Sequence, residues 1–412
     1  PAEEDKLAAA LLHQLAYLAD DGIPQGWIET LAQTNKLAIR RALGTLAKYS
    51  LASWDRDKKQ LAVHAVTQRV LRHSQSQSQS PVAALSKSLV QYTPKASKQE
   101  RIALLPHGRR LHARLLKGHS NTRDKQGQLD HALSKCLFEL CAAAGLHEES
   151  LSWAQRSLAL AKRNSGPEGD ADDIAYAQSL IGTALARLGR YQEACEHKQR
   201  ALELRTELMQ RYSDEQASEK RQAMLGEIAF THNSLGELYA YLGQYDAAIT
   251  HTLQALGIRQ ALSAGKDTQL IARSLNGLGV AIEGLARQQS DAKQATAQSV
   301  GAPLQKAFAQ LQGYGLSAAR LREELKELRN ATAQQRDAVA LRYKQKSLAM
   351  NESLGDKRAI AHSLHNVGET MIALASRTKE AKSIEAGIEY CRKALALRRE
   401  LDREELYVAR TL

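Results

Sequence analysis

The chain has 412 residues, a length typical of two to three domains, and 43% of them are hydrophobic, enough for ordinary cores. Aromatic residues make up only 5% and there are seven prolines, so the composition favours helices over extensive sheet. The formal net charge is +12, but no dense basic block carries it, which argues against a nucleic-acid-binding tail.

Cysteine usage and hydropathy exclude two further classes of protein. Four scattered cysteines (Cys136, Cys141, Cys195 and Cys391) are too few for a disulfide framework, and they show no zinc-ligand spacing. No signal peptide and no apolar run of about 18 residues occurs. We therefore expect a soluble cytoplasmic protein. Because the chain starts at Pro1 without Met, we also expect it to be a piece of something longer.

Positions 1–73 have the element order of a winged helix. Helical patterns cover residues 7–18, 26–33, 36–49 and 65–72. Two short apolar stretches around a charged turn, "SLASWDRDKKQLAVH" (50–64), predict a β-hairpin before the last helix, and "DDGIP" (20–24) reads as a break. We predict a winged-helix domain over 1–73, followed by a linker and connecting helix over 74–100. That linker opens with the low-complexity stretch "SQSQSQS" (74–80).

Three stretches of this segment, "LLHQLAYLADDGIP", "ALGTLAKYSLASWD" and "LAVHAVTQRVLR", resemble the winged helix of NB-ARC-type signal-transduction NTPases, the STAND class. "ALLPHGRRL" (103–111) is similar to the lead-in to the repeats of the same proteins. In that family the winged helix joins a nucleotide-binding domain to superhelical repeats. The resemblance implies a nucleotide-sensing role for His64, within Val63-His64-Ala65, but only beside an upstream nucleotide-binding domain, since no phosphate-binding loop occurs here. A histidine that packs or caps at a strand–helix junction is the alternative.

Two stretches further along repeat each other. Residues 174–202 read "IAYAQSLIGTALARLGRYQEACEHKQRAL", and residues 228–256 read "IAFTHNSLGELYAYLGQYDAAITHTLQAL". A glycine inside the first helix of each unit (Gly182, Gly236) indicates close helix–helix approach, because glycine otherwise costs a helix about 1 kcal/mol. A second glycine, Gly189 or Gly243, ends that helix. Two alanines seven residues apart then allow the second helix of each unit to pack closely on the first; they are Ala194 and Ala201, and Ala248 and Ala255. Further copies begin at "IARSLNGLG" (271–279) and "IAHSLHNVG" (360–368).

These residues resemble tetratricopeptide repeats (TPRs), and the long spacing resembles those of kinesin light chains. A helical hairpin cannot bury its apolar face alone, so we predict a TPR superhelix over 101–412. A helical insertion is expected near 287–335, where Leu316, Leu321, Leu325 and Leu328 share one face, with a disordered loop as the alternative. The terminal "LYVARTL" (406–412) looks like the opening of another repeat. The predicted fold class is all-α with a small β-hairpin wing.

No catalytic, metal or cofactor motif appears, so no enzyme activity, cofactor or metal is expected. His362 and His365 share a helix face but lack a third ligand. We predict that the repeats bind a protein or peptide in their concave groove, as the sensor or scaffold of a STAND-type NTPase. Groove residues are predicted to be Tyr176, Arg187, Asn233, Glu237, Arg273, Asn276, His365 and Asn366. For the asparagines, hydrogen bonding between neighbouring helices is the alternative.

Two other functions compete with this interpretation. One is a transcription regulator whose winged helix binds DNA. The residues that would contact the phosphates are Lys36, Arg40, Arg41 and Lys48 on the third helix and Arg56, Lys58 and Lys59 in the wing. The predicted winged helix holds ten Lys/Arg and eight Asp/Glu, a balance of only +2, so nucleic acid is not an expected partner, and neither is a membrane. The repeats alone would also allow a kinesin-light-chain-like cargo adaptor, which the winged helix disfavours.

Overall fold

The computed structural model describes residues 3–20, 22–55, 57–73, 81–117, 123–164, 171–211, 218–264, 266–291, 301–326, 328, 331, 335–378 and 380–401. The low-complexity stretch 74–80, Arg56 of the predicted wing and the terminal 406–412 lie outside this range. The chain divides into two compact units, Pro1–Arg190 and Tyr191–Leu412.

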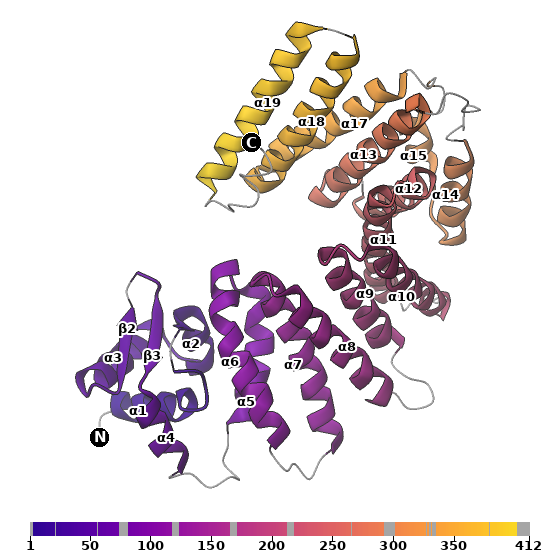
Figure 1. The fold of residues 1–412 in the computed structure, drawn as a ribbon. Helices are drawn as coiled ribbons and strands as arrows, with labels where there is room; N and C mark the ends of the chain where they lie inside the picture. The colour runs from indigo at the N-terminus through magenta and orange to yellow at the C-terminus, as the bar shows by residue number, and fades with distance from the viewer. Residues whose placement is uncertain are drawn as a thin grey trace. The chain divides into compact units, whose positions relative to one another are not determined.

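The first unit begins with three helices, a small sheet and a fourth helix (Figure 1). The helices are α1 (Glu3–Leu15), α2 (Gln25–Ala32), α3 (Lys36–Lys48) and α4 (Ala65–His73), and the strands are β1 (Ile23–Pro24), β2 (Ala52–Asp55) and β3 (Gln60–Val63). Asn35 caps α3 by accepting a 2.8 Å hydrogen bond from the Ala38 backbone N–H. The helices and the predicted hairpin therefore occur where the sequence places them, and the chain is predominantly helical.

The sheet has one strand that the sequence pattern does not reveal. The stretch "DDGIP" reads as a break, but Ile23 pairs with Leu61 and Pro24 with Gln60, so β1 is an edge strand in the order β1-β3-β2. Proline is tolerated there because an edge strand leaves one side without ladder bonds. A strand of only two paired residues is too short to show an alternation of apolar and polar side chains, which explains why the pattern misses it.

The rest of the first unit is a stack of helices on this segment. It comprises α5 (Val82–Tyr92), a 3₁₀ turn (Thr93–Lys95), α6 (Lys98–Lys117), α7 (Arg123–Ala143), α8 (His147–Asn164) and α9 (Ala171–Arg187). One hydrophobic core runs from α1 to α8, with Trp27, Leu89, Leu104 and Leu137 fully buried. Each such side chain contributes about 1.5–3 kcal/mol through burial. The predicted connecting helix within 74–100 corresponds to α5, which belongs to this core.

A buried carboxylate ties three helices of this unit together. Asp130 on α7 accepts hydrogen bonds from Arg156 on α8, the shortest at 2.6 Å, and its Oδ1 lies 3.0 Å from His112 Nε2 on α6. Burial alone would raise the pKa of Asp130, but the hydrogen bonds with His112 and Arg156 and their charges lower it to about 2. The carboxylate is therefore held charged inside the helix stack.

Asp130→Asn is expected to reduce the free energy of unfolding by about 2 kcal/mol at neutral pH. The folded pKa lies below the ordinary value of 3.8, so the stabilisation is complete above that value and disappears as the pH falls towards about 2. Urea unfolding of both proteins at several pH values checks this. A difference in stability that stays constant down to about pH 2 would contradict it.

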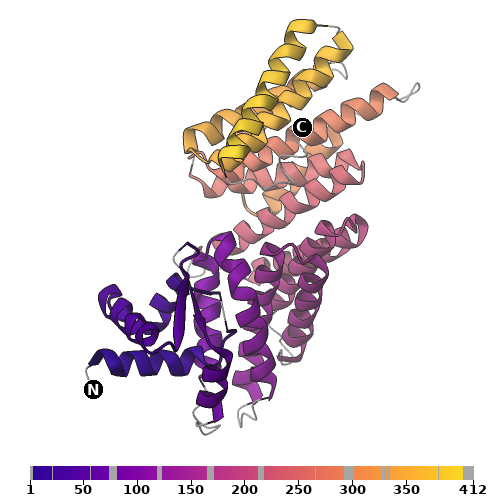
Figure 2. The same cartoon turned by 60° about the vertical axis from the view of Figure 1, so that its left-hand side comes forward.

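The second unit consists of helical hairpins. Its helices are α10 (Tyr191–Arg211), α11 (Ser218–Tyr241), α12 (Tyr245–Leu262), α13 (Gln269–Asp291), α14 (Gly301–Gly313), α15 (Ala319–Glu324), α17 (Arg336–Leu354), α18 (Lys357–Thr378) and α19 (Ala381–Glu400). The packing pairs α11 with α12, α13 with α17, and α18 with α19. The last pair is a long antiparallel hairpin in both ribbon views (Figure 1, Figure 2). In each hairpin we call the helix that comes earlier in the chain the first helix and its partner the second helix.

The repeated glycines have two distinct roles. Gly189 and Gly243 have φ of 76° and 72°, and each lies two residues beyond the last residue of its helix, the position of a left-handed C′ residue. Gly236 lies inside α11, where an added Cβ would sit 2.3 Å from Thr252 Oγ1 and 3.2 Å from the Ala248 carbonyl oxygen of α12. The close approach of the two helices in this hairpin therefore requires glycine.

Two helices, α14 and α15, lie in the stretch predicted as an insertion between the partners α13 and α17. They pack on α12, where Leu311 of α14 fills the space above Gly257. Arg221 of α11 donates a 2.8 Å hydrogen bond to the Tyr314 carbonyl. Of the four leucines predicted to share one face, Leu321, Leu325 and Leu328 are buried, but Leu316 precedes α15 and is half-buried, so a single helix does not carry all four. The insertion is thus built onto the second helix of the preceding hairpin.

Candidate protein-binding face

A buried basic residue recurs at one position of α10, α12 and α19. Arg205, Arg259 and Arg398 each follow a packing alanine by one helical turn (Ala201, Ala255 and Ala394), and their exposed fractions are only 1%, 5% and 8%. Arg205 donates to Thr231 Oγ1 (2.5 Å) and pairs with Glu227 (2.7 Å), both on α11. Asn351 takes the same position in α17 and donates to Ser363 of α18 at 2.9 Å. Arg205 thus joins α10 to α11, and Asn351 joins α17 to α18.

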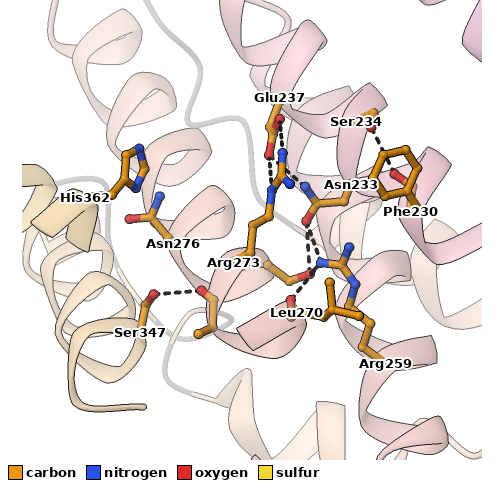
Figure 3. A network of polar contacts seen from close by, with 12 residues as sticks. Phe230, Asn233, Ser234, Glu237, Arg259, Leu270, Arg273, Asn276, Ser347 and His362 are labelled. Atoms are coloured by element: carbon orange, nitrogen blue, oxygen red, sulfur yellow. Dashed lines mark hydrogen bonds and ion pairs between the residues drawn. The ribbon is translucent and has the colours of Figure 1, made fainter. Parts of the chain in front are cut away.

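Arg259 shows why Asn233 is not a surface residue. The Nη1 of Arg259 donates to Asn233 Oδ1 (2.8 Å), to Ser274 Oγ (2.6 Å) and to the Leu270 carbonyl (2.7 Å) (Figure 3). Asn233, one of the predicted groove residues, is only 3% exposed. Its carboxamide nitrogen donates to Glu237 at 2.8 Å. The geometry of Asn233 therefore matches the alternative of hydrogen bonding between neighbouring helices.

The predicted groove residues Glu237, Arg273, Asn276 and Asn366 reach the surface, together with neighbours on the same helices that were not predicted. The solvent-facing side of α11 presents Phe230, Ser234, Glu237 and Tyr241, that of α13 presents Arg273, Asn276 and Val280, and that of α18 presents His362, Asn366 and Glu369. Within each helix these positions are three or four apart and so share one side. We call the surface formed by these side chains the α11–α13–α18 face.

Side chains connect the three helices across this face. Arg273 forms a two-point ion pair with Glu237, both distances being 3.0 Å. Asn366 donates a 2.9 Å hydrogen bond to Asn276 Oδ1, and its amide nitrogen lies 3.3 Å from His362 Nδ1. The first helices of three hairpins therefore lie side by side, although α14, α15 and α17 separate α13 from α18 in the sequence (Figure 3).

The remaining predicted groove residues differ in their surroundings. His365 is 5% exposed, and its Nε2 lies 3.2 Å from Glu369 Oε1. Tyr176 and Arg187 belong to α9, in the first unit, whereas the other predicted groove residues belong to the second. The Lys135 ammonium lies 5.3 Å from the centre of the Tyr176 ring, and Arg187 donates to the Ala142 carbonyl at 3.2 Å.

His64 lies between β3 and α4 with an exposed side chain. Its carbonyl accepts a hydrogen bond from the Gln68 backbone N–H at 3.0 Å, which starts α4. The basic residues considered for DNA include Lys36, which pairs with Glu29 at 3.6 Å, and Lys58, which pairs with Asp55 at 3.7 Å. Such pairing reduces the charge available to a phosphate backbone.

Across the part of the chain that the structure describes, no helix is long and apolar enough to cross a membrane. No group of three or more His, Cys, Asp or Glu side chains among these residues could hold a metal ion.

Comparison with known proteins supports the repeat assignment locally. Residues 136–207 match the family model described as "Tetratricopeptide repeat". No curated protein sequence matches the chain significantly.

Three solved structures illustrate the structural similarity. BtubC (BKLC) from P. vanneervenii is 16% identical, with 74% of this chain and 93% of that chain covered and a TM-score of 0.43. The apo form of RapI is also 16% identical, with coverages of 77% and 98% and a TM-score of 0.42. A STAND protein with a tetratricopeptide repeat sensor from Pyrococcus horikoshii is 13% identical, with coverages of 98% and 61% and a TM-score of 0.36. The family match thus places tetratricopeptide repeats in residues 136–207 of this chain.

Proposed function

We propose that the chain is a non-catalytic interaction module and that the α11–α13–α18 face binds an extended protein segment. The observation that carries this proposal is the continuous row of surface side chains across three first helices, joined by the Glu237–Arg273 and Asn276–Asn366 contacts. A globular fold does not need such polar pairs on its surface for stability, because exposed pairs contribute only about 0–1 kcal/mol.

The chemistry of this row suits a peptide backbone. Asn276 uses its carbonyl oxygen for Asn366. Its amide nitrogen makes no further hydrogen bond within the described residues, so it is available to a peptide carbonyl. Phe230 is 41% exposed and Val280 is 38% exposed, so apolar side chains of a ligand would find contacts beside the polar groups. Glu237 supplies a negative charge and Arg273 a positive one, so the pair would favour ligands whose charged side chains complement it.

Asn276→Ala is expected to weaken a bound peptide about 3- to 10-fold, the equivalent of one neutral hydrogen bond. A peptide display library selected against the whole chain supplies the ligand, and titration calorimetry measures its affinity. The matched control is Gln305→Ala, which removes an exposed carboxamide from α14, away from this face. Unchanged binding by the Asn276 variant, or an equal loss in the Gln305 variant, would refute the assignment of this face.

We further propose that residues 1–73 form a STAND-type winged helix that transmits signals from these repeats to an adjoining nucleotide-binding domain. The order of α1 to α4 with the hairpin and the exposed position of His64 support this. In this arrangement His64 would approach the nucleotide phosphates held by that domain.

This chain by itself is expected to bind no ATP by calorimetry, because it has no phosphate-binding loop. In a longer protein that includes a nucleotide-binding domain, His64→Ala is expected to weaken ADP binding about tenfold, the loss of one charge-assisted hydrogen bond. Micromolar ATP binding by the chain alone, lost on His64→Ala, would overturn this division of roles.

A further inference from the structure

Three arginines converge where the end of α1 meets α4 and α6. We call Arg72 of α4 together with Arg110 and Arg114 of α6 the arginine cluster, and all three side chains are half-buried. The Nη1 atoms of Arg72 and Arg110 lie 3.4 and 3.3 Å from the same atom, Gln68 Oε1. The Arg114 guanidinium lies 5.5 Å from the centre of the Tyr17 ring. All these residues belong to the first unit.

This cluster contains positive charge that no carboxylate among the described residues balances. The charged neighbours that act on Arg72 are Arg110 and Arg69, and those that act on Arg114 are Arg72 and Arg110. Burial first, and then these like charges, lower the pKa of both Arg72 and Arg114. Arg109, which directly precedes Arg110 on α6, behaves in the opposite way. It pairs with the carboxylate of Glu149, and this pairing raises its pKa.

Capping of α1 accounts for only part of the cluster. Arg72 donates to the Ala16 carbonyl, and Arg110 donates to the Leu18 carbonyl at 2.7 Å, so each uses Nη1 to satisfy the end of that helix. Arg114 has no such role. Its Nε is buried without a hydrogen-bond partner in the described structure, which is costly for a charged group. Each guanidinium carries five N–H donors, so most donors of the cluster remain unused within the described residues.

We propose that the arginine cluster binds a small anion bearing phosphate groups. Guanidinium groups match phosphate oxygens with paired hydrogen bonds, and three of them together favour an anion of more than one negative charge. Partial exposure leaves the cluster open to a ligand, while Gln68 contacts Arg72 and Arg110 and the Tyr17 ring contacts Arg114. The site is independent of the α11–α13–α18 face, which belongs to the other unit.

The test is titration calorimetry of the whole chain with inorganic pyrophosphate at constant ionic strength, with citrate and chloride for comparison. Saturable pyrophosphate binding is expected, at least about tenfold weaker in Arg114→Gln, because a charge-assisted hydrogen bond is lost. Arg114 makes no hydrogen bond within the described residues, so this variant should keep the wild-type melting temperature. Arg114→Lys, which keeps the charge but loses the paired geometry, should weaken binding several-fold.

The control is Arg40→Gln, which removes the same charge from the exposed surface of α3 and should leave the affinity unchanged. Several results would overturn the proposal: no pyrophosphate binding by the folded wild-type chain, an equal loss in Arg40→Gln, or citrate binding as tight as pyrophosphate binding. Binding of anionic vesicles or of an oligonucleotide without binding of pyrophosphate would overturn it too.

Discussion

Replacing Lys344 with alanine is expected to lower the free energy of unfolding by about 3–5 kcal/mol, because the change leaves a carboxylate buried without its main cation. Lys344 Nζ lies 2.5 Å from Glu283 Oε2, and the side chains are only 4% and 9% exposed. Lys344 also donates to Thr370 at 2.6 Å, so α13, α17 and α18 all meet at this ammonium group. Arg287 also pairs with Glu283, but its side chain is half-exposed and compensates only partly.

The effect of Lys344→Ala should depend on pH in a defined direction. Burial alone would raise the pKa of Glu283, but the charge and hydrogen bond of Lys344 lower it below 4.5. A depressed folded pKa gives stability that is complete above the unfolded value and disappears as the pH falls through the folded value. The difference between wild type and variant, measured by urea unfolding, should therefore shrink below about pH 4.

A double variant distinguishes this account from a simple packing defect. Lys344→Met with Glu283→Leu removes both charges at similar volume, and it should recover most of the lost stability. If the double variant is as unstable as Lys344→Ala, loss of packing and not an unpaired carboxylate explains the effect.

The sequence predicts most elements of this fold because local patterns determine them. The helical periods, the capping Asn35, the turn glycines Gly189 and Gly243 and the hairpin at 50–64 all depend on neighbours close by in the chain. The strand β1 depends instead on pairing with β3, which follows only after α2, α3 and β2, and so short a strand carries no pattern of its own.

The candidate site is predicted less completely, for a related reason. Glu237, Arg273, Asn276 and Asn366 reach the surface as the repeat positions suggest, but Asn233 occupies an equivalent position to Asn276 and is buried. Its carboxamide is held inside by Arg259, which comes from another helix. The recurring "LELR", "LGIR" and "LALR" (202–205, 256–259 and 395–398) would have pointed to these arginines. From the sequence alone, however, an arginine at the end of an apolar run is more simply interpreted as an exposed, solvated side chain.

The same network predicts a large effect for Arg259→Leu, a loss of about 2–4 kcal/mol of unfolding free energy. Burial lowers the pKa of Arg259 to about 10, so the group is still charged at neutral pH. One nitrogen of this side chain satisfies Asn233, Ser274 and the Leu270 carbonyl at once. Leucine fills similar space but removes the donor that these acceptors share, so Asn233 Oδ1 keeps only the 3.1 Å hydrogen bond from Ser274 Oγ, and α12 loses this polar link to α13.

Arg273→Leu is the matched control for Arg259→Leu. It removes the same charged group from the neighbouring helix α13, but its ion pair with Glu237 is exposed, so a loss of no more than about 1 kcal/mol is expected. Adding Asn233→Leu to Arg259→Leu removes one of the orphaned acceptors and should restore part of the stability. Equal melting temperatures for the two arginine variants would show that the buried arginines do not hold these repeats together.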